Sequence, residues 1–177
     1  MKKIQYSIMM LLIISITAFS QSKTYSNGNL TYTLPDGWKQ SKIIKKGKGI
    51  SYGGSYFNLG ESIQFSVIEM QSPPNKTIDL ITESDFRGAV KSMFHPQSIF
   101  ENNSIIKYIG SIKTKYLEAF AYVKGKKVYS LNYVTVYKRK VMFIQGIYKS
   151  KNINKAKKVI NSIIETIKFR LYVDWCG

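Results

Sequence analysis

The 177-residue chain contains one cysteine, one histidine, four prolines and ten acidic residues. A single cysteine excludes a small domain held together by disulfides and a four-cysteine zinc site. One histidine and ten dispersed carboxylates leave few groups for acid–base catalysis or for coordinating a hard cation. We therefore expect a protein that is not an enzyme and that has no catalytic residue, no metal and no other cofactor.

Positive charge and apolar side chains are abundant instead. Lysine and arginine number 27, the formal net charge is +17, and 44% of the residues are hydrophobic. That apolar content excludes a disordered basic tail, and the length suits one folded domain. Only three of the basic residues are arginine. Because dedicated phosphate and nucleic-acid sites favour the arginine fork, this composition argues against a nucleic-acid partner.

The first twenty residues have the pattern of a secretory signal peptide. Lys2 and Lys3 precede an apolar run over residues 8–14, and Ala18 and Ser20 are the small residues of a cleavage site before Gln21. The run is shorter than the ~20 residues that span a bilayer. We expect export to the periplasm or the cell exterior, with residues 21–177 forming a single domain. The alternative is a short hydrophobic first helix of the fold.

Alternating apolar residues predict strands in the first half of the mature chain. Leu30–Leu34 and Ser62–Met70 have the period of a half-buried strand. Pro35-Asp36-Gly37 predicts a turn after the first of these strands, and Trp38 begins a short return segment. Residues 45–48 are predicted to form a basic loop.

A helix is predicted to follow, with Thr82 as its N-cap and Asp85 completing an acidic capping box. Phe86, Val90 and Phe94 lie on one face of this helix, and Pro96 ends it.

The second half predicts four strands and a closing helix. The strands cover residues 104–112, 116–123, 126–137 and 140–148, with tight turns at Lys124-Gly125 and Lys138-Arg139. The closing helix has an apolar stripe made of Ile153, Ala156, Val159, Ile160, Ile163, Ile164 and Ile167. Hairpin connections predict an antiparallel sheet. Since residues 126–137 have apolar side chains on both faces, we expect an α+β domain, specifically an α/β/α sandwich with a central antiparallel sheet.

This order of elements resembles the PsbP-like family, including bacterial members grouped with DcrB-type envelope proteins. The resemblance covers residues 28–169 and is most specific at Pro35-Asp36-Gly37-Trp38. It implies an α/β/α sandwich, an exported location and a binding role. In photosynthetic members it implies docking on photosystem II, a function that nothing in this sequence supports. Residues 170–177 extend past the family-like end and could form an edge strand or a docking segment.

The candidate binding surface is basic. Its predicted contacts to an anionic envelope component or to membrane headgroups are Lys45, Lys46, Lys48, Lys124, Lys126, Lys127, Lys138, Arg139 and Lys140. Tyrosine–lysine neighbours also recur at strand ends, which suits an anionic glycan or single-stranded nucleic acid but equally a solvated sheet edge. These neighbours are Lys107-Tyr108, Lys115-Tyr116, Tyr137-Lys138 and Tyr148-Lys149.

Two other function classes stay open. A small secreted hydrolase would need a cleft that converges on His95 or on Glu83 and Asp85, although a capping role explains both acids. An immunity-type protein would bind one tight protein partner. Cys176, near the end of the chain, is either a free thiol or half of an intermolecular disulfide.

Overall fold

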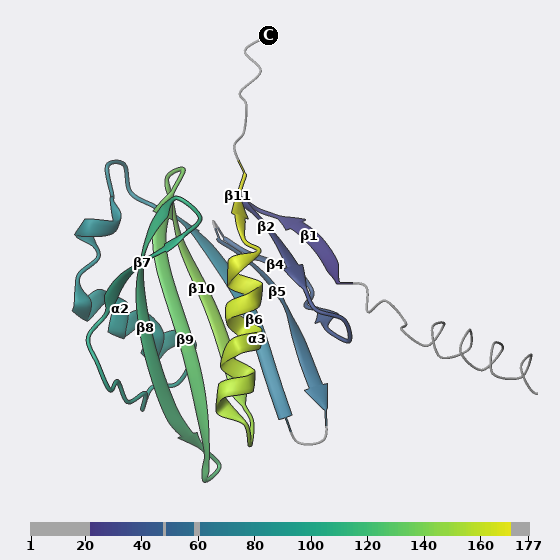
Figure 1. Ribbon diagram of the computed structural model, residues 1–177. Helices are drawn as coiled ribbons and strands as arrows, with labels where there is room; N and C mark the ends of the chain where they lie inside the picture. Colours follow the sequence, from purple (N-terminus) through teal and green to yellow (C-terminus); the bar gives the residue numbers. More distant parts are fainter. Residues whose placement is uncertain (1–21, 48, 59–60, 171–177) are drawn as a thin grey trace, which may run out of the picture.

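The computed structural model describes residues 22–47, 49–58 and 61–170 (Figure 1). The strands are β1 (Lys23–Asn27), β2 (Leu30–Leu34), β3 (Lys39–Gln40), β4 (Ile44–Lys46), β5 (Gly49–Asn58), β6 (Glu61–Gln71), β7 (Ile105–Ile109), β8 (Ile112–Val123), β9 (Lys126–Tyr137), β10 (Lys140–Lys149) and β11 (Lys168–Phe169). The helices are a 3₁₀ turn (Ile78–Leu80), α2 (Glu83–Met93) and α3 (Ile153–Glu165). Within these ranges, no helix has the length and apolar character needed to cross a membrane.

One large antiparallel sheet dominates the fold. Its strand order is β3-β5-β6-β10-β9-β8-β7, and β4 pairs with β5 beside β3. The strands from β7 to β10 follow one another as hairpins, which is the arrangement that the short turns predict. A second, smaller sheet has the order β1-β2-β11. An antiparallel sheet with two helices is thus confirmed.

The large sheet buries apolar side chains on both faces. On one face, Phe65, Leu131 and Ile144 pack with the buried stripe of α3 and with Leu30 and Tyr32 of the small sheet. On the other face, side chains of β8, β9 and β10 pack with Phe86 and Val90 of α2. Figure 1 shows α3 in front of the sheet and α2 behind it. Because successive side chains of a strand point to opposite faces, the large sheet contributes to two hydrophobic cores, one beneath α3 and one beneath α2.

A close approach fixes α3 against the sheet. Gly146 of β10 faces Ile160, and a Cβ added at Gly146 would lie 2.3 Å from Ile160 Cγ2. Any larger residue at position 146 would therefore push the helix away. Both helices begin with side-chain caps: Asn152 accepts from Lys155 N at α3, and Thr82 forms the predicted capping box with Asp85 at α2.

Several details differ from the sequence predictions. The turn between β7 and β8 lies at Gly110-Ser111, because Gly110 supplies a positive φ, and residues 113–115 belong to β8. Lys45 and Lys46 are in β4 rather than in a loop. Ile153 is 37% exposed, so it begins α3 outside the core. Strands β1, β5 and β11 were not predicted at all.

The predicted signal peptide, Lys48 and the tail over residues 171–177 with Cys176 lie outside the described residues. The last described residue of the tail, Arg170, donates its backbone N–H to Asn29 O at 2.8 Å.

Candidate functional site

The structure separates the predicted basic residues into two groups at opposite ends of β9. Lys124, Lys126 and Lys127 lie at or beside the β8–β9 turn, whereas Lys138, Arg139 and Lys140 lie at the β9–β10 turn. The 12 residues of β9 separate the two turns by about 36–40 Å at ~3.3 Å per residue. A single ligand of small size cannot contact both groups.

Five basic residues define what we name the basic end. They are four of the predicted contact residues, Lys45, Lys138, Arg139 and Lys140, together with Arg170. Lys45 belongs here because the strand register places it at the same end of the sheet as Lys140. Its neighbour Lys46 in β4 pairs with Gly49 of β5, and Gly49 pairs with Met70 of β6. Met70 in turn pairs with Val141 of β10, the residue after Lys140. Arg170 belongs here because Tyr137 donates its hydroxyl to Arg170 O at 3.1 Å. The register of distant strands therefore gathers these residues on one edge of the molecule.

A buried carboxylate lies next to the basic end and pairs with one of its lysines. Glu69 of β6 is fully buried and accepts hydrogen bonds from Tyr52 Oη at 2.5 Å and from Asn29 N and Nδ2 at 2.8 and 2.9 Å. The Lys140 ammonium lies 3.0 Å from Glu69 Oε2, the oxygen that also accepts from Asn29 Nδ2. Burial alone would raise the pKa of Glu69, but the Tyr52, Asn29 and Lys140 contacts together hold it below its usual range.

The two turns that delimit β9 have unusual backbone dihedrals. Both residues of each turn have positive φ: 49° and 70° at Lys124 and Gly125, and 48° and 57° at Lys138 and Arg139. Two-residue hairpins favour this geometry, and Asn-Gly is the sequence that adopts it most readily. The Lys138-Arg139 turn reaches it without a glycine.

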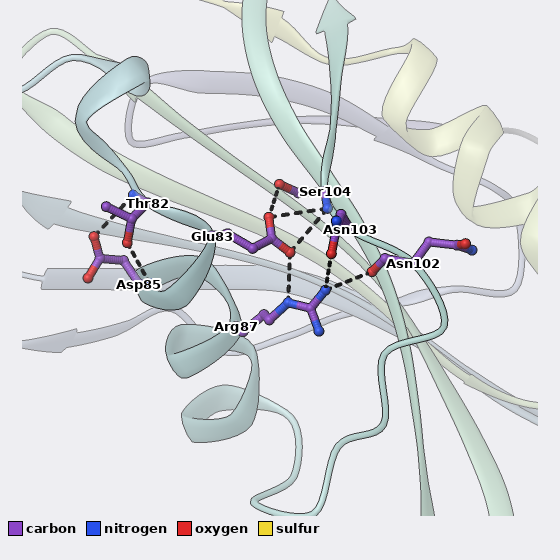
Figure 2. Close-up of polar contacts among 7 residues, drawn as sticks. All are labelled: Thr82, Glu83, Asp85, Arg87, Asn102, Asn103 and Ser104. Atoms are coloured by element: carbon purple, nitrogen blue, oxygen red, sulfur yellow. Dashed lines mark hydrogen bonds and ion pairs between the residues drawn. The ribbon is translucent and has the colours of Figure 1, made fainter.

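The two acids considered for a hydrolase are used at the start of α2 (Figure 2). Asp85 accepts from Thr82 N, and Thr82 Oγ1 accepts from Asp85 N, each at 3.1 Å. Glu83 accepts from Ser104 N and Oγ and from Arg87 Nε. Arg87 in turn donates to Asn102 O and Asn103 Oδ1. These contacts attach α2 to the loop before β7.

His95 lies beyond α2 and accepts from Gln97 N at its Nδ1 atom, 3.3 Å away. None of the contacts described for Glu83 or Asp85 involves this imidazole. Among the residues that the structure describes, no group of three or more histidine, cysteine or acidic side chains could hold a metal ion.

The tyrosine–lysine neighbours do not stack as sequence pairs along the strands, because adjacent strand residues point to opposite faces. Lysines instead cover aromatic rings of the neighbouring strand. Lys107 Nζ lies 3.6 Å from the centre of the Tyr116 ring, and Lys127 Nζ lies 3.7 Å from that of Phe120. Lys138 is the exception, 5.6 Å from the ring of Tyr137. Cation–π contacts thus occupy several of the aromatic faces.

The sequence did not predict a charged cluster around Glu118. Glu118 of β8 accepts from Tyr116 Oη at 2.5 Å and pairs with Lys157 of α3 at 2.6 Å. Burial lowers the pKa of nearby Lys107; the Glu118 carboxylate opposes this shift, and the Lys157 ammonium adds to it. Glu118 also borders two hollows of about 200 and 430 Å³. The cluster joins α3 to β8, and only the fold brings its members together.

A further hollow of about 220 Å³ lies beneath the Pro35–Trp38 turn, between the start of α3 and strands β5 and β6. Trp38 and Tyr56 both line it, with their rings 6.4 Å apart and inclined by 27°. The sequence predicted a turn at Pro35–Trp38, but it did not predict that this turn lines a cavity.

Comparison with known proteins finds similarity in structure. No family profile matches the sequence, and no curated protein matches it. Cyanobacterial PsbP (CyanoP) from Synechocystis superposes with a TM-score of 0.67 at 17% identity, covering 85% of this chain and 94% of CyanoP. LpqN, involved in cell envelope biogenesis of Mycobacterium tuberculosis, gives a TM-score of 0.52 at 13% identity, covering 88% of this chain and 97% of LpqN.

A protein from Bacteroides thetaiotaomicron has a TM-score of 0.55 at 14% identity and is matched over 50% of its length by 86% of this chain. The chain therefore belongs to the class of antiparallel α+β domains. Its fold is PsbP-like, as the resemblance at Pro35–Trp38 and in the closing helix implies. At these identities the likeness concerns the fold alone.

Proposed function

We propose that this chain is an exported, non-catalytic accessory domain of the cell envelope whose basic end binds phosphate groups on an anionic surface. The signal pattern before Gln21 supports export. The fold shared with LpqN, which is described as involved in cell envelope biogenesis, supports an envelope role. We also propose that α3, the large sheet and α2 form the three layers of the α/β/α sandwich of PsbP-like domains. The small sheet lies on the same face of the large sheet as α3.

The Lys138-Arg139 turn is the observation that carries this proposal. A residue with a side chain in the left-handed region costs about 1–2 kcal/mol relative to its right-handed conformation. Both residues of this turn have positive φ, and neither is glycine. Asn-Gly would form the same turn with less strain. A requirement for two cations at this position accounts for the departure.

The neighbourhood of the turn is suited to present positive charge. Arg139 O accepts from Ser72 N at 2.9 Å, and Lys140 is held by Glu69. The turn is thus anchored through Arg139 O and through the Lys140 side chain, and it lies at the end of two central strands of the sheet. An electrostatic contact of this kind weakens as salt screens it.

Vesicle binding tests the proposal. The chain from Gln21 is mixed with vesicles of phosphatidylglycerol and phosphatidylcholine, with pure phosphatidylcholine as the uncharged control. We expect sedimentation with the anionic vesicles only, falling steeply between about 50 and 500 mM salt. A soluble polyphosphate added as competitor distinguishes the two sources of phosphate: strong competition favours a polymer, and weak competition favours the membrane surface.

Charge reversal locates the contact. Lys138→Glu with Arg139→Glu should abolish most of the binding, whereas Lys124→Glu with Lys126→Glu makes the same change in net charge at the other end of β9 and should weaken it far less. Equal losses in the two variants would contradict a localised basic site. Binding that ignores salt would contradict an electrostatic one.

A further inference from the structure

We propose that the hollow beneath the Pro35–Trp38 turn binds a small organic ammonium group. The hollow has a volume of about 220 Å³. Pockets for drug-sized ligands usually occupy about 300–1,000 Å³, so this one suits a single small headgroup or side chain. It is distinct from the basic end: Glu61, which lines it, begins β6, while Gln71 at the other end of β6 pairs with Lys140.

Aromatic side chains form one wall of this hollow. Lys39 of β3 pairs with Ser55 of β5, and this register brings the preceding Trp38 beside the following Tyr56. Gly37 holds a φ of 76°, and a Cβ at this position would lie 3.5 Å from Tyr56 Cε2. The turn therefore lies directly against the Tyr56 ring. A cation over the face of tryptophan or tyrosine is attracted by the ring quadrupole.

The charge of the hollow is reversed relative to the rest of the protein. The chain carries 27 basic residues against ten acidic ones. Of the three charged residues that line the hollow, however, Asp36 and Glu61 are carboxylates and only Lys155 is a cation. Ser150 donates its hydroxyl to Glu61 Oε1 at 2.8 Å, which orients this carboxylate. Local acidity in a strongly basic protein favours a cationic ligand.

Apolar side chains line the remainder of the hollow. Ile63 of β6 and Ala156 and Val159 of α3 supply this surface. Methyl or methylene groups of an alkylammonium ligand can pack there, while a hydrated metal ion would gain nothing from it. The combination of aromatic rings, carboxylates and alkyl groups is the chemistry that recognises choline-like ammonium compounds.

Choline and its uncharged isostere 3,3-dimethylbutan-1-ol are the probes for this site. The chain has two tryptophans. In a Trp175→Phe background, Trp38 is therefore the sole tryptophan, and excitation at wavelengths too long for the 13 tyrosines to absorb selects its emission. We expect saturable quenching or shifting of Trp38 emission by choline, and binding of the isostere that is weaker by about 10-fold. Equal binding of the two probes, or no saturable response to choline, would overturn the proposal.

Substitutions separate the contributions to binding. Glu61→Gln should weaken choline binding by about 5–10-fold, and Tyr56→Leu by a comparable factor. Lys155→Gln removes a like charge and should strengthen binding by about 2–3-fold. Glu101→Gln is the matched control, because Glu101 lines a different hollow beside Tyr129. Unfolding curves and far-UV circular dichroism verify that each variant is folded.

Unchanged choline affinity in both folded Glu61→Gln and Tyr56→Leu would overturn the assignment to this hollow. The outcome is independent of the vesicle experiment, since Lys138 and Arg139 do not line the hollow. Loss of vesicle binding in the Lys138→Glu, Arg139→Glu variant should leave choline binding unchanged.

Discussion

The two tight turns at the ends of β9 have a similar backbone and different residues. Lys124-Gly125 meets the requirement for positive φ with a glycine at the second position, whereas Lys138-Arg139 meets it with two long cationic side chains. A hairpin selected for folding alone would use the first solution or Asn-Gly. Under the proposed function, the β8–β9 turn serves the fold alone, whereas the β9–β10 turn also presents positive charge.

The surroundings of the β9–β10 turn agree with this distinction. Arg139 O is bonded by Ser72, and Lys140 reaches the fully buried carboxylate of Glu69, which also holds Asn29 in the β1–β2 turn. Gly28 precedes Asn29 with a φ of 55°, and a Cβ there would lie 2.1 Å from Glu69 Oε1. The small sheet and the basic end thus depend on one carboxylate.

Removing the charge of Glu69 should have the largest effect. Glu69→Gln leaves the Lys140 ammonium without its counter-charge and weakens the bonds from Tyr52 and Asn29, so we expect a loss of about 2–3 kcal/mol in the free energy of unfolding. Urea unfolding measures it. The matched control is Glu118→Gln, whose partly exposed pair with Lys157 should cost less than about 1 kcal/mol. Similar losses in the two variants would contradict the special role of Glu69.

The same carboxylate predicts a pH dependence. Because the pKa of Glu69 is lowered in the folded protein, its contribution to stability is complete above the usual glutamate range near ~4.3 and is lost as the pH falls through the lowered value. Stability measured between about pH 6 and pH 3 should therefore fall more steeply in the parent than in Glu69→Gln. Parallel curves would contradict this prediction.

Relieving the strained turn should stabilise the protein. Lys138→Asn with Arg139→Gly provides the preferred sequence of a two-residue hairpin, and we expect a gain of about 1–2 kcal/mol. For a domain of this size the melting temperature rises by about 2–4 °C per kcal/mol. A loss of stability would show that the two side chains contribute more to folding than the backbone strain costs.

Substitution in the β8–β9 turn should have the smallest effect on stability. Lys124→Asn improves only the first position, since Gly125 already occupies the second, so the expected gain is about 0.5 kcal/mol or less. The measurement is again urea unfolding. A gain equal to that of the double variant would mean that the two turns do not differ in strain.

The sequence predicted the elements whose signals are local. Period-2 alternation located β2, β6 and β9, and the i, i+3, i+4 stripe located α3 with nearly its observed bounds. Thr82 and Asp85 form the capping box that their spacing predicts. The error at Ile153 has a simple cause, because the first residue of a helix can lie outside the face that packs.

The sequence did not predict what depends on long-range pairing. Strand β11 has two residues, and its pairing with β2 brings Lys168 opposite Thr31, a partner that no local pattern identifies. The gathering of Lys45 with Lys140 depends on the register of four strands. The Trp38–Tyr56 wall and the Glu118 cluster depend on cross-strand and helix–sheet contacts in the same way.

Stability and vesicle binding measured together on the turn variants test the central claim most directly. If the β9–β10 turn keeps its strain in order to present charge, Lys138→Asn with Arg139→Gly will raise the melting temperature and sharply reduce sedimentation with phosphatidylglycerol vesicles at about 50 mM salt. Lys124→Asn will change neither by much. A double variant that is more stable and binds as well as the parent would contradict the account.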